Sequence, residues 1–147
     1  MKSVLISIRP HWCAKIVSNK TIEVRKTRPK LETPFKAYIY CTMPDARDPY
    51  NILELHGADG KIRKANGKVM GEFVCDKVYE LAPINHAPDG VEQQACLTRE
   101  EIVRYLRGVG YGWHISDLKI YEQPRKLEEF GVKRLPQSWM YVEEIER

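Results

Sequence analysis

Apolar and polar positions alternate from the start of the chain. Residues 3–8 place Val4, Ile6 and Ile8 on one side of an extended backbone, with polar residues at both flanks, which predicts a first strand. Pro10 then suits the first position of a helix. Four apolar residues follow at helical spacing, which predicts a short helix with one buried side: Trp12, Cys13, Ile16 and Val17. Alternation resumes over 21–25 and predicts a second strand.

The rest of the chain carries further strand patterns and one clear helix. Strands are expected over 35–42, 68–81, 112–121 and 139–145. Thr98 and Glu101 form a capping box, which predicts a helix that ends at Gly108. Residues 124–131 suggest a turn and a short helical step. Residues 44–67 are interpreted as a long loop with a short helical or hairpin insertion, and 83–96 as an irregular connection.

These elements predict an α+β fold. Short helices without regular strand–helix–strand alternation favour a mostly antiparallel curved sheet, or a small β-barrel with the helices packed at its side. Such a barrel leaves a cleft where a helix packs beside the strand ends. Nothing in the pattern divides the chain, so one domain over 1–147 is expected.

The second strand has one apolar and one charged side. Ile22 and Val24 share the first side, whereas the opposite side is formed by Thr21, Glu23 and Arg25. Further cations flank it: Lys20, Lys26, Arg28 and Lys30. This pattern predicts a surface that holds a polar ligand, with the cations facing phosphate. The alternative is a solvated strand face on which a glutamate and an arginine form an ion pair.

Composition narrows the class of protein. The 147 residues have a formal net charge of +4, which permits a nucleic-acid partner without requiring one. No apolar stretch is long enough to span a bilayer, and the first ten residues do not form a secretory signal, so a cytoplasmic location is the expectation. No glycine-rich phosphate loop, dinucleotide fingerprint or metalloprotease helix is present.

The four cysteines do not predict a metal site. They lie far apart in sequence and lack the close spacing of a zinc or redox motif: Cys13, Cys41, Cys75 and Cys96. We expect buried, structural thiols, and no metal or cofactor.

Two other groups carry possible chemistry. Glu72 lies in an apolar strand pattern and needs a partner if it is buried, for which Lys20 or Arg25 is expected. A lysine and a glutamate paired in a cleft are suited to general acid–base work, whereas a solvated glutamate at an edge is the alternative. His114 and Asp117 form a second possible pair, either for acid–base chemistry or as a structural hydrogen bond.

Aromatic residues near the basic segments are candidates for base stacking: Tyr38, Tyr40, Trp113 and Trp139. Core packing is the alternative for these rings.

The motif over residues 18–25 resembles that of the ASCH family, within the PUA-like superfamily. The family's signature is Gly-x-Lys-x-x-Glu-x-Arg after the first helix. This chain has Lys20, Glu23 and Arg25 in the matching places and departs from the signature at Ser18, which replaces the glycine. The resemblance covers most of the chain. It implies a PUA-like β-barrel with a cleft, and binding of RNA or a nucleotide-like ligand.

The resemblance also implies two enzymatic branches. One resembles an amidohydrolase acting on N4-acetylcytidine, whose lysine and glutamate fall on Lys20 and Glu72 here. Glu23 stands where that branch has its threonine, so Thr21 is the substitute. The other branch is implied to be a ribonuclease, in which Lys20, Glu23 and Arg25 would bind and polarise a phosphate.

Three functions therefore stay open. The first is a module that binds RNA or a modified nucleoside, with a cleft lined by Lys20, Glu23, Arg25, Lys26, Arg28, Tyr40 and Trp139. The second is a hydrolase of either branch. The third is a protein-interaction domain that uses the 44–67 loop. The ligand and the oligomeric state are not specified by the sequence.

Overall fold

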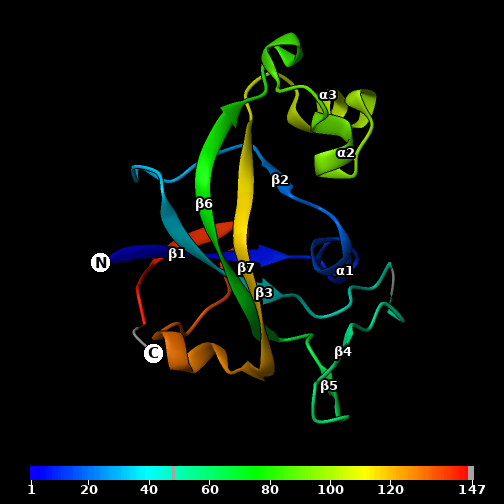
Figure 1. Cartoon of the computed structure of the whole chain (residues 1–147), viewed down its shortest axis with the longest axis vertical. Coiled ribbons are helices and arrows are strands. Elements are labelled where there is room, and N and C mark those ends of the chain that lie inside the picture. Colours follow the sequence, from blue (N-terminus) through cyan, green and yellow to red (C-terminus); the bar gives the residue numbers. More distant parts are fainter. Residues whose placement is uncertain (48, 146–147) are drawn as a thin grey trace.

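A computed structural model describes residues 1–47 and 49–145. Figure 1 shows two long curved strands, β6 and β7, with helices α2 and α3 at one end and the small β4–β5 hairpin at the other. The elements, in chain order, are β1 (Lys2–Ile8), α1 (Pro10–Ser18), β2 (Ile22–Arg25), β3 (Phe35–Cys41), β4 (Glu54–His56), β5 (Ile62–Lys64), β6 (Lys68–Glu80), the 3-10 helix η1 (Ile84–His86), α2 (Val91–Ala95), α3 (Arg99–Leu106), β7 (Tyr111–Arg125), the 3-10 helix η2 (Leu127–Phe130) and β8 (Trp139–Glu143).

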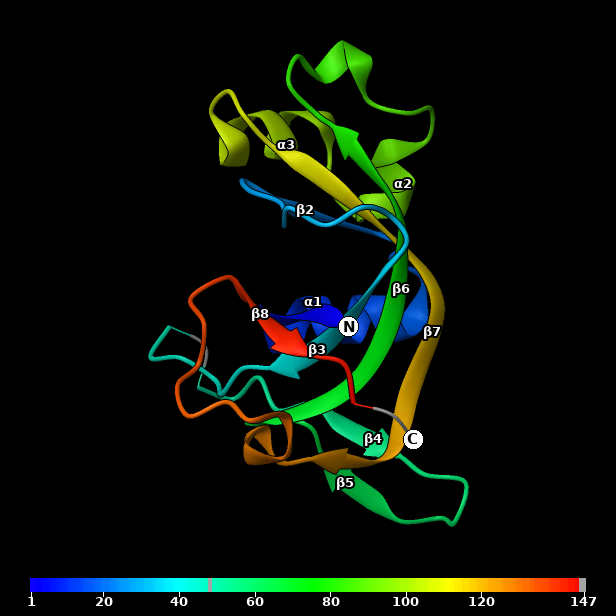
Figure 2. The ribbon, with the colours of Figure 1, turned by 90° about the vertical axis from the view of Figure 1, so that its left-hand side faces the viewer.

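The main sheet has six strands in the order β2-β7-β6-β3-β1-β8. Only β1 and β3 run parallel; the other neighbours are antiparallel. The sheet curls into a half-barrel whose two edge strands, β2 and β8, have no backbone pairing with one another (Figure 2). The expected α+β fold with a curved, mostly antiparallel sheet is therefore confirmed.

Bulges and one glycine produce the curl. The β6–β7 register shifts at three places, and each shift bends and twists the strands locally. At Gly71 an added Cβ atom would lie 2.5 Å from the Lys119 carbonyl oxygen, so only glycine allows the two strands to approach this closely.

The core lies on both sides of the sheet. The main cluster packs α1 against β1, β3, β6 and β7, and includes Val4, Ile6, Ile8, Cys13, Ile16, Phe35, Ile39, Phe73 and Trp113. A second cluster lies against η2 on the other face and includes Leu5, Tyr38, Tyr40, Tyr121 and Phe130. Because β1 is covered on both faces, successive residues of this strand are buried, as is usual for strands with a parallel neighbour inside a sheet.

A third cluster joins β2 to the helices at the end of the molecule. Ile22 and Val24 pack with Ile102 and Leu106 of α3. The capping box of α3 is confirmed: Thr98 Oγ1 accepts from the Glu101 amide, and the Glu101 carboxylate accepts from the Thr98 amide. The 44–67 segment contains a hairpin, one of the two insertions expected there.

Helix α2, like the shorter η1, is an element that the sequence pattern misses. It has only five residues and follows Gly90, whose φ of 76° starts the turn. A helix this short has too few positions for a visible period. None of the helices in residues 1–47 and 49–145 has the length and apolar character needed to cross a bilayer.

Candidate functional site

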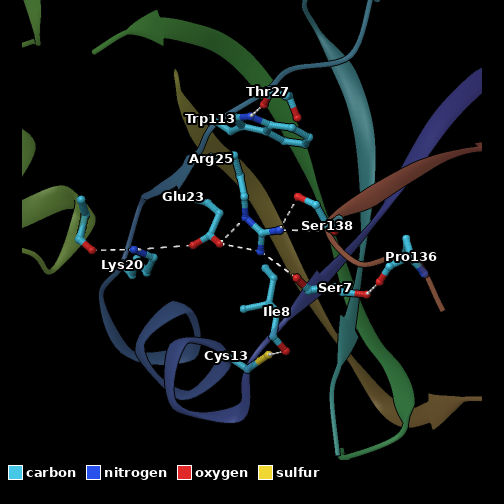
Figure 3. Close-up of polar contacts among 11 residues, drawn as sticks. Ser7, Ile8, Cys13, Lys20, Glu23, Arg25, Thr27, Trp113, Pro136 and Ser138 are labelled. Atoms are coloured by element: carbon cyan, nitrogen blue, oxygen red, sulfur yellow. Dashed lines mark hydrogen bonds and ion pairs between the residues drawn. The ribbon is translucent and has the colours of Figure 1, made fainter. Parts of the chain in front are cut away.

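Lys20, Glu23 and Arg25 converge on one another inside the half-barrel (Figure 3). Lys20 follows α1, and its amide donates to the Lys15 carbonyl oxygen at 2.7 Å, so the helix end fixes where the strand begins. Glu23 accepts from Arg25 Nε at 2.9 Å, and its other oxygen lies 3.6 Å from Lys20 Nζ. We call these three residues the buried network, because their exposed fractions are 2%, 6% and 9%.

Arg25 connects the two edges of the sheet. Its Nη2 donates to the Ser7 carbonyl oxygen in β1 at 2.7 Å, and its Nη1 donates to Ser138 Oγ, just before β8, at 3.0 Å. The same guanidinium pairs with Glu23 at 2.8 Å. A planar fork with five donors can satisfy several acceptors at once. Arg25 thus closes the half-barrel by side-chain hydrogen bonds, at the place where no strand ladder joins β2 to the other edge.

Lys20 is the member of the buried network that contacts α2. Its ammonium donates to the Ala95 carbonyl oxygen and stands 4.8 Å from the centre of the Trp12 ring. Burial lowers the pKa of Lys20, and the Glu23 carboxylate offsets this only in part. A buried ammonium with a lowered pKa can act as an acid or a base, and it can equally be a structural contact.

The charged side of β2 faces inward because the strand is covered on both faces. Its apolar side packs against α3 and its charged side faces the interior of the curl, so all four residues of β2 are buried. The convergence of lysine, glutamate and arginine is as expected from the sequence, but the solvated strand face is wrong. That these residues bind a ligand stays a prediction.

An open groove begins one residue after the network. It has a volume of about 600 Å³ and is lined by Lys26, Thr27, Arg28, Pro29, Lys30, Leu31, Glu32, Val109 and Tyr111. We call it the basic groove, because three cations line it against a single carboxylate. No ion pair of these three cations is present among the described residues.

Aromatic residues of β7 and β8 hold the wall of the basic groove. Trp113 Nε1 donates to the Thr27 carbonyl oxygen at 3.3 Å, and Trp139 Nε1 donates to Thr27 Oγ1 at 2.9 Å. The Lys30 amide donates to the Tyr141 hydroxyl at 2.7 Å. The Trp139 ring contacts those of Trp113 and Tyr141 edge to face, with centroids 6.0 and 5.3 Å apart. The wall is thereby fixed before any ligand arrives.

The two predicted cations of the groove are placed differently. Lys26 is exposed and its Nζ lies 5.1 Å from the centre of the Tyr105 ring in α3. Arg28 is half-buried and donates to the carbonyl oxygens of Pro29 and Leu31, at 3.2 and 3.0 Å. Arg28 therefore stiffens the loop, and Lys26 is freer to reach a ligand.

Glu72 does not join the buried network, so the expected pairing with Lys20 or Arg25 is wrong. Its carboxylate pairs with Lys36 Nζ at 3.1 Å and accepts from the Tyr121 hydroxyl at 2.7 Å. Burial alone would raise the pKa of Glu72. The hydrogen bonds from Tyr121 and Lys36 lower the pKa by more than burial raises it, so the pKa of Glu72 is below its usual value. The physical reason is the period of the strand: Phe73 packs into the main core, so its neighbour points to the other face.

Three other predicted residues do not line the basic groove: Tyr40, Trp139 and Thr21. Tyr40 is 4% exposed within the second core cluster, so its ring has no face for a base. Trp139 is half-buried beside the basic groove and keeps part of its surface. Thr21 Oγ1 lies 3.4 Å from Gln94 Oε1 at α2, beside the network but turned toward the helix.

His114 pairs with Asp76 rather than with Asp117. Its Nδ1 lies 2.7 Å from Asp76 Oδ1 and 3.2 Å from Ser116 Oγ. Both partners share one ring nitrogen, so the three residues are not arranged as a relay from serine through histidine to acid. Asp117 instead lies within β7, where its backbone is left-handed with φ of 48°.

The cysteines are free thiols, and Cys13, Cys41 and Cys75 are buried, as predicted. Burial raises the pKa of Cys75 to about 12, so this thiol is not a nucleophile near neutral pH. Within residues 1–47 and 49–145, no group of three metal-binding side chains is present.

Sequence reasoning missed Ser7, Ser138 and Thr27 as partners of the site. Arg25 reaches Ser138 across 113 positions, and Trp139 reaches Thr27 across 112. No local pattern marks contacts of this range, because they depend on how the sheet curls. Nothing in the sequence pattern indicated that Tyr111 lines the basic groove.

Comparison with known proteins identifies structures that share this fold. No protein-family model matches the chain, and no curated protein matches its sequence. The chain is similar to the crystal structure of ASCH from Zymomonas mobilis, with a TM-score of 0.69 and 17% identity over 97% of this chain and 88% of that chain. A mutant ZmASCH protein gives a TM-score of 0.70 and 18% identity, covering 98% of this chain and 92% of that one. The chain therefore has the fold of an ASCH protein, as the resemblance of the sequence implied.

Proposed function

We propose that this chain is an ASCH-like domain that binds single-stranded RNA or a modified nucleoside, and that its ligand lies in the basic groove. The observation that carries the proposal is a fixed groove with three cations beside an aromatic row, on a fold shared with ASCH proteins. Cations without an internal ion pair can bind phosphate groups, and an unstacked base can stack on an exposed aromatic ring.

Different residues of the basic groove would contact the phosphate and the base of the ligand. Lys26 and Lys30 are exposed, so they contact phosphate oxygens without losing a structural bond. Tyr111 lines the groove and Trp139 borders it, and either ring offers a surface for a base. Glu32 is the single carboxylate in the lining and suits an exocyclic amine.

The buried network fixes the backbone directly before the groove. Arg25 and Glu23 hold the first residues of the segment, and the groove begins at the next position. In this proposal the motif sets the path of the chain, and the ligand contacts the residues that follow it. The motif's cations are not the primary contacts, because a ligand would first have to break their internal bonds.

Binding of a fluorescent single-stranded RNA, followed by anisotropy against salt concentration, tests the proposal. We expect the Lys26→Ala/Lys30→Ala variant to lose about tenfold or more in affinity and to have a salt slope smaller by about 2. The matched control is Lys15→Ala/Lys133→Ala, which removes two exposed lysines outside the groove. Equal losses in both variants, or no binding by the unmodified chain at low salt, would reject the proposal.

A second candidate is a hydrolase, favoured by the buried Lys20 with its lowered pKa beside a carboxylate. Because Glu72 lies elsewhere, the acid–base pair of such an enzyme would be Lys20 and Glu23. Incubation with N4-acetylcytidine or RNA at high protein concentration tests it. Turnover that Lys20→Met abolishes in a folded variant supports this candidate, and the absence of turnover by the unmodified chain rejects it.

A further inference from the structure

A second cavity lies at the other end of the long strands, beside the β4–β5 hairpin. It has a volume of about 360 Å³ and is lined by Arg63, Lys64, Asn66, Lys68, Gln123 and Pro124. We propose that this cavity is an anion site that binds a phosphate group. Its volume falls in the usual range of small-ligand sites.

The charges in its wall are one-sided. Three cations line the cavity, and no carboxylate does. Arg63 is paired with Asp59 at 2.7 Å. Glu54 is the strand neighbour of Lys64, yet the described residues form no ion pair between these two, and none at Lys68. Two uncompensated ammonium groups beside a guanidinium repel one another, and an anion between them removes that repulsion.

The frame of the cavity is rigid. Asn66 is 3% exposed, and its Oδ1 accepts from the Leu53 amide at 2.7 Å. Its Nδ2 donates to the carbonyl oxygens of Thr42 and Asn51, at 3.1 and 3.3 Å. The Asn66 side chain thus joins its own segment to Thr42 and to residues 51–53. The neighbouring cations therefore project from a fixed backbone. A site formed before binding loses less entropy when its ligand arrives.

A buried donor without a partner among the described residues follows the lining residue Pro124 in the chain. Arg125 follows Pro124, and its guanidinium stands 4.5 Å from the centre of the Tyr121 ring. Its Nη1 is shielded from solvent and has no hydrogen-bond partner among the described residues. Buried donors are almost always paired, so an orphaned one indicates a missing partner. Arg125 itself does not line the cavity, so the anion contacts in this proposal are Arg63, Lys64 and Lys68.

The anion site is separate from the basic groove. Tyr111 borders the groove and Gln123 borders the cavity, about 40 Å apart along β7 at the usual rise per residue. Both views show β7 running from the α3 end to the β4–β5 end (Figures 1 and 2). The inference therefore does not rest on the proposed function.

Titration of the ¹⁵N-labelled chain with inorganic phosphate at low salt tests the site. We expect NMR shift changes centred on residues 63–68 and 123–125. The Lys64→Ala/Lys68→Ala variant should weaken binding by about tenfold, as expected for the loss of two charge-assisted contacts. Lys61→Ala is the matched control, since Lys61 is an exposed cation of the same hairpin and does not line the cavity.

Two results would overturn the inference. One is a phosphate titration that leaves residues 63–68 unmoved in the unmodified chain. The other is an equal loss of affinity in Lys61→Ala, which would mean that only general positive charge attracts the anion. The Lys26→Ala/Lys30→Ala variant should keep phosphate binding at this cavity, so the two proposals fail independently.

A single-stranded RNA in place of phosphate distinguishes the source of the anion. If the Lys64→Ala/Lys68→Ala variant weakens RNA binding as well, the phosphate belongs to a nucleic-acid backbone. If it weakens only inorganic phosphate binding, the site takes a small phosphorylated molecule. Either result supports an anion site.

Discussion

Arg25 and Lys26 are neighbours in sequence and yet belong to two different environments. Arg25 is 9% exposed and its guanidinium has bonds to Glu23, Ser7 and Ser138. Lys26 is exposed and its only described contact is with the face of a tyrosine ring. The same kind of charge therefore closes the fold at one position and is open to a ligand at the next.

The difference shows that charge density in a sequence does not by itself locate a binding surface. Cations whose donors are filled by backbone carbonyls and a carboxylate have little left to offer a ligand. Removing one partner of such a buried group is costly, because the other charge stays buried and unpaired. Exposed cations cost little to remove, and their loss is felt only when a ligand is present.

Replacing Arg25 tests the structural half of this comparison and should give the largest effect. We expect Arg25→Ala to lower the free energy of unfolding by about 3–5 kcal/mol, because Glu23, the Ser7 carbonyl oxygen and the Ser138 hydroxyl lose their partner. Lys26→Ala is the control and should change stability by less than about 0.5 kcal/mol. Urea denaturation measures both. Similar values for the two variants would contradict the division.

The pH dependence of stability sharpens the role of Lys20. The unfolded chain holds the Lys20 proton up to the ordinary pKa of 10.5, whereas burial lets the folded protein release it at lower pH. Between these two pH values the unfolded state binds more protons, so the stability contributed by this residue rises with pH. Urea denaturation from pH 7 to 10.5, against a Lys20→Met variant, should therefore show the unmodified chain gaining stability relative to the variant. A constant difference would mean that the pKa of Lys20 is not lowered.

Glu72 gives the smallest expected effect and tests its separation from the network. The pKa of Glu72 is lower in the folded protein than its usual 4.5, so its stabilising contribution is complete above that pH and is lost as pH falls through the lowered pKa. We expect Glu72→Gln to cost about 0.5–1 kcal/mol at pH 7, as for a partly exposed ion pair, and nothing at the lowest pH. Lys36→Met should show the same pH profile. A profile that follows Lys20→Met instead would place Glu72 in the network after all.

The sequence predicted local structure well and long-range geometry poorly. The first strand and helix, the capping box at Thr98 and the long strand from Lys68 follow from periods and caps, which depend only on neighbouring residues. The side on which Glu72 lies also follows from a period, but its partner depends on which strand packs opposite. Residues such as Ser138 could not be assigned, because the curl of the sheet brings them to Arg25 from more than a hundred positions away.

The motif illustrates the same limit. Alternation over 21–25 correctly separated apolar from charged side chains, but it could not tell that both faces of the strand are covered. That coverage comes from α3 on one side and from the closing of the half-barrel on the other. Tyr40 was misjudged for a similar reason, since its strand is buried on both faces.

The affinity of the Arg25→Lys variant for single-stranded RNA, measured where that variant is still folded, tests the central claim most directly. The substitution keeps the positive charge but removes the planar fork that joins the two edges of the sheet. If Arg25 closes the fold and the ligand lies in the basic groove, the variant should be less stable and still bind RNA within about twofold of the unmodified chain. A folded variant that loses more than about tenfold in affinity would show that the ligand contacts the buried network itself.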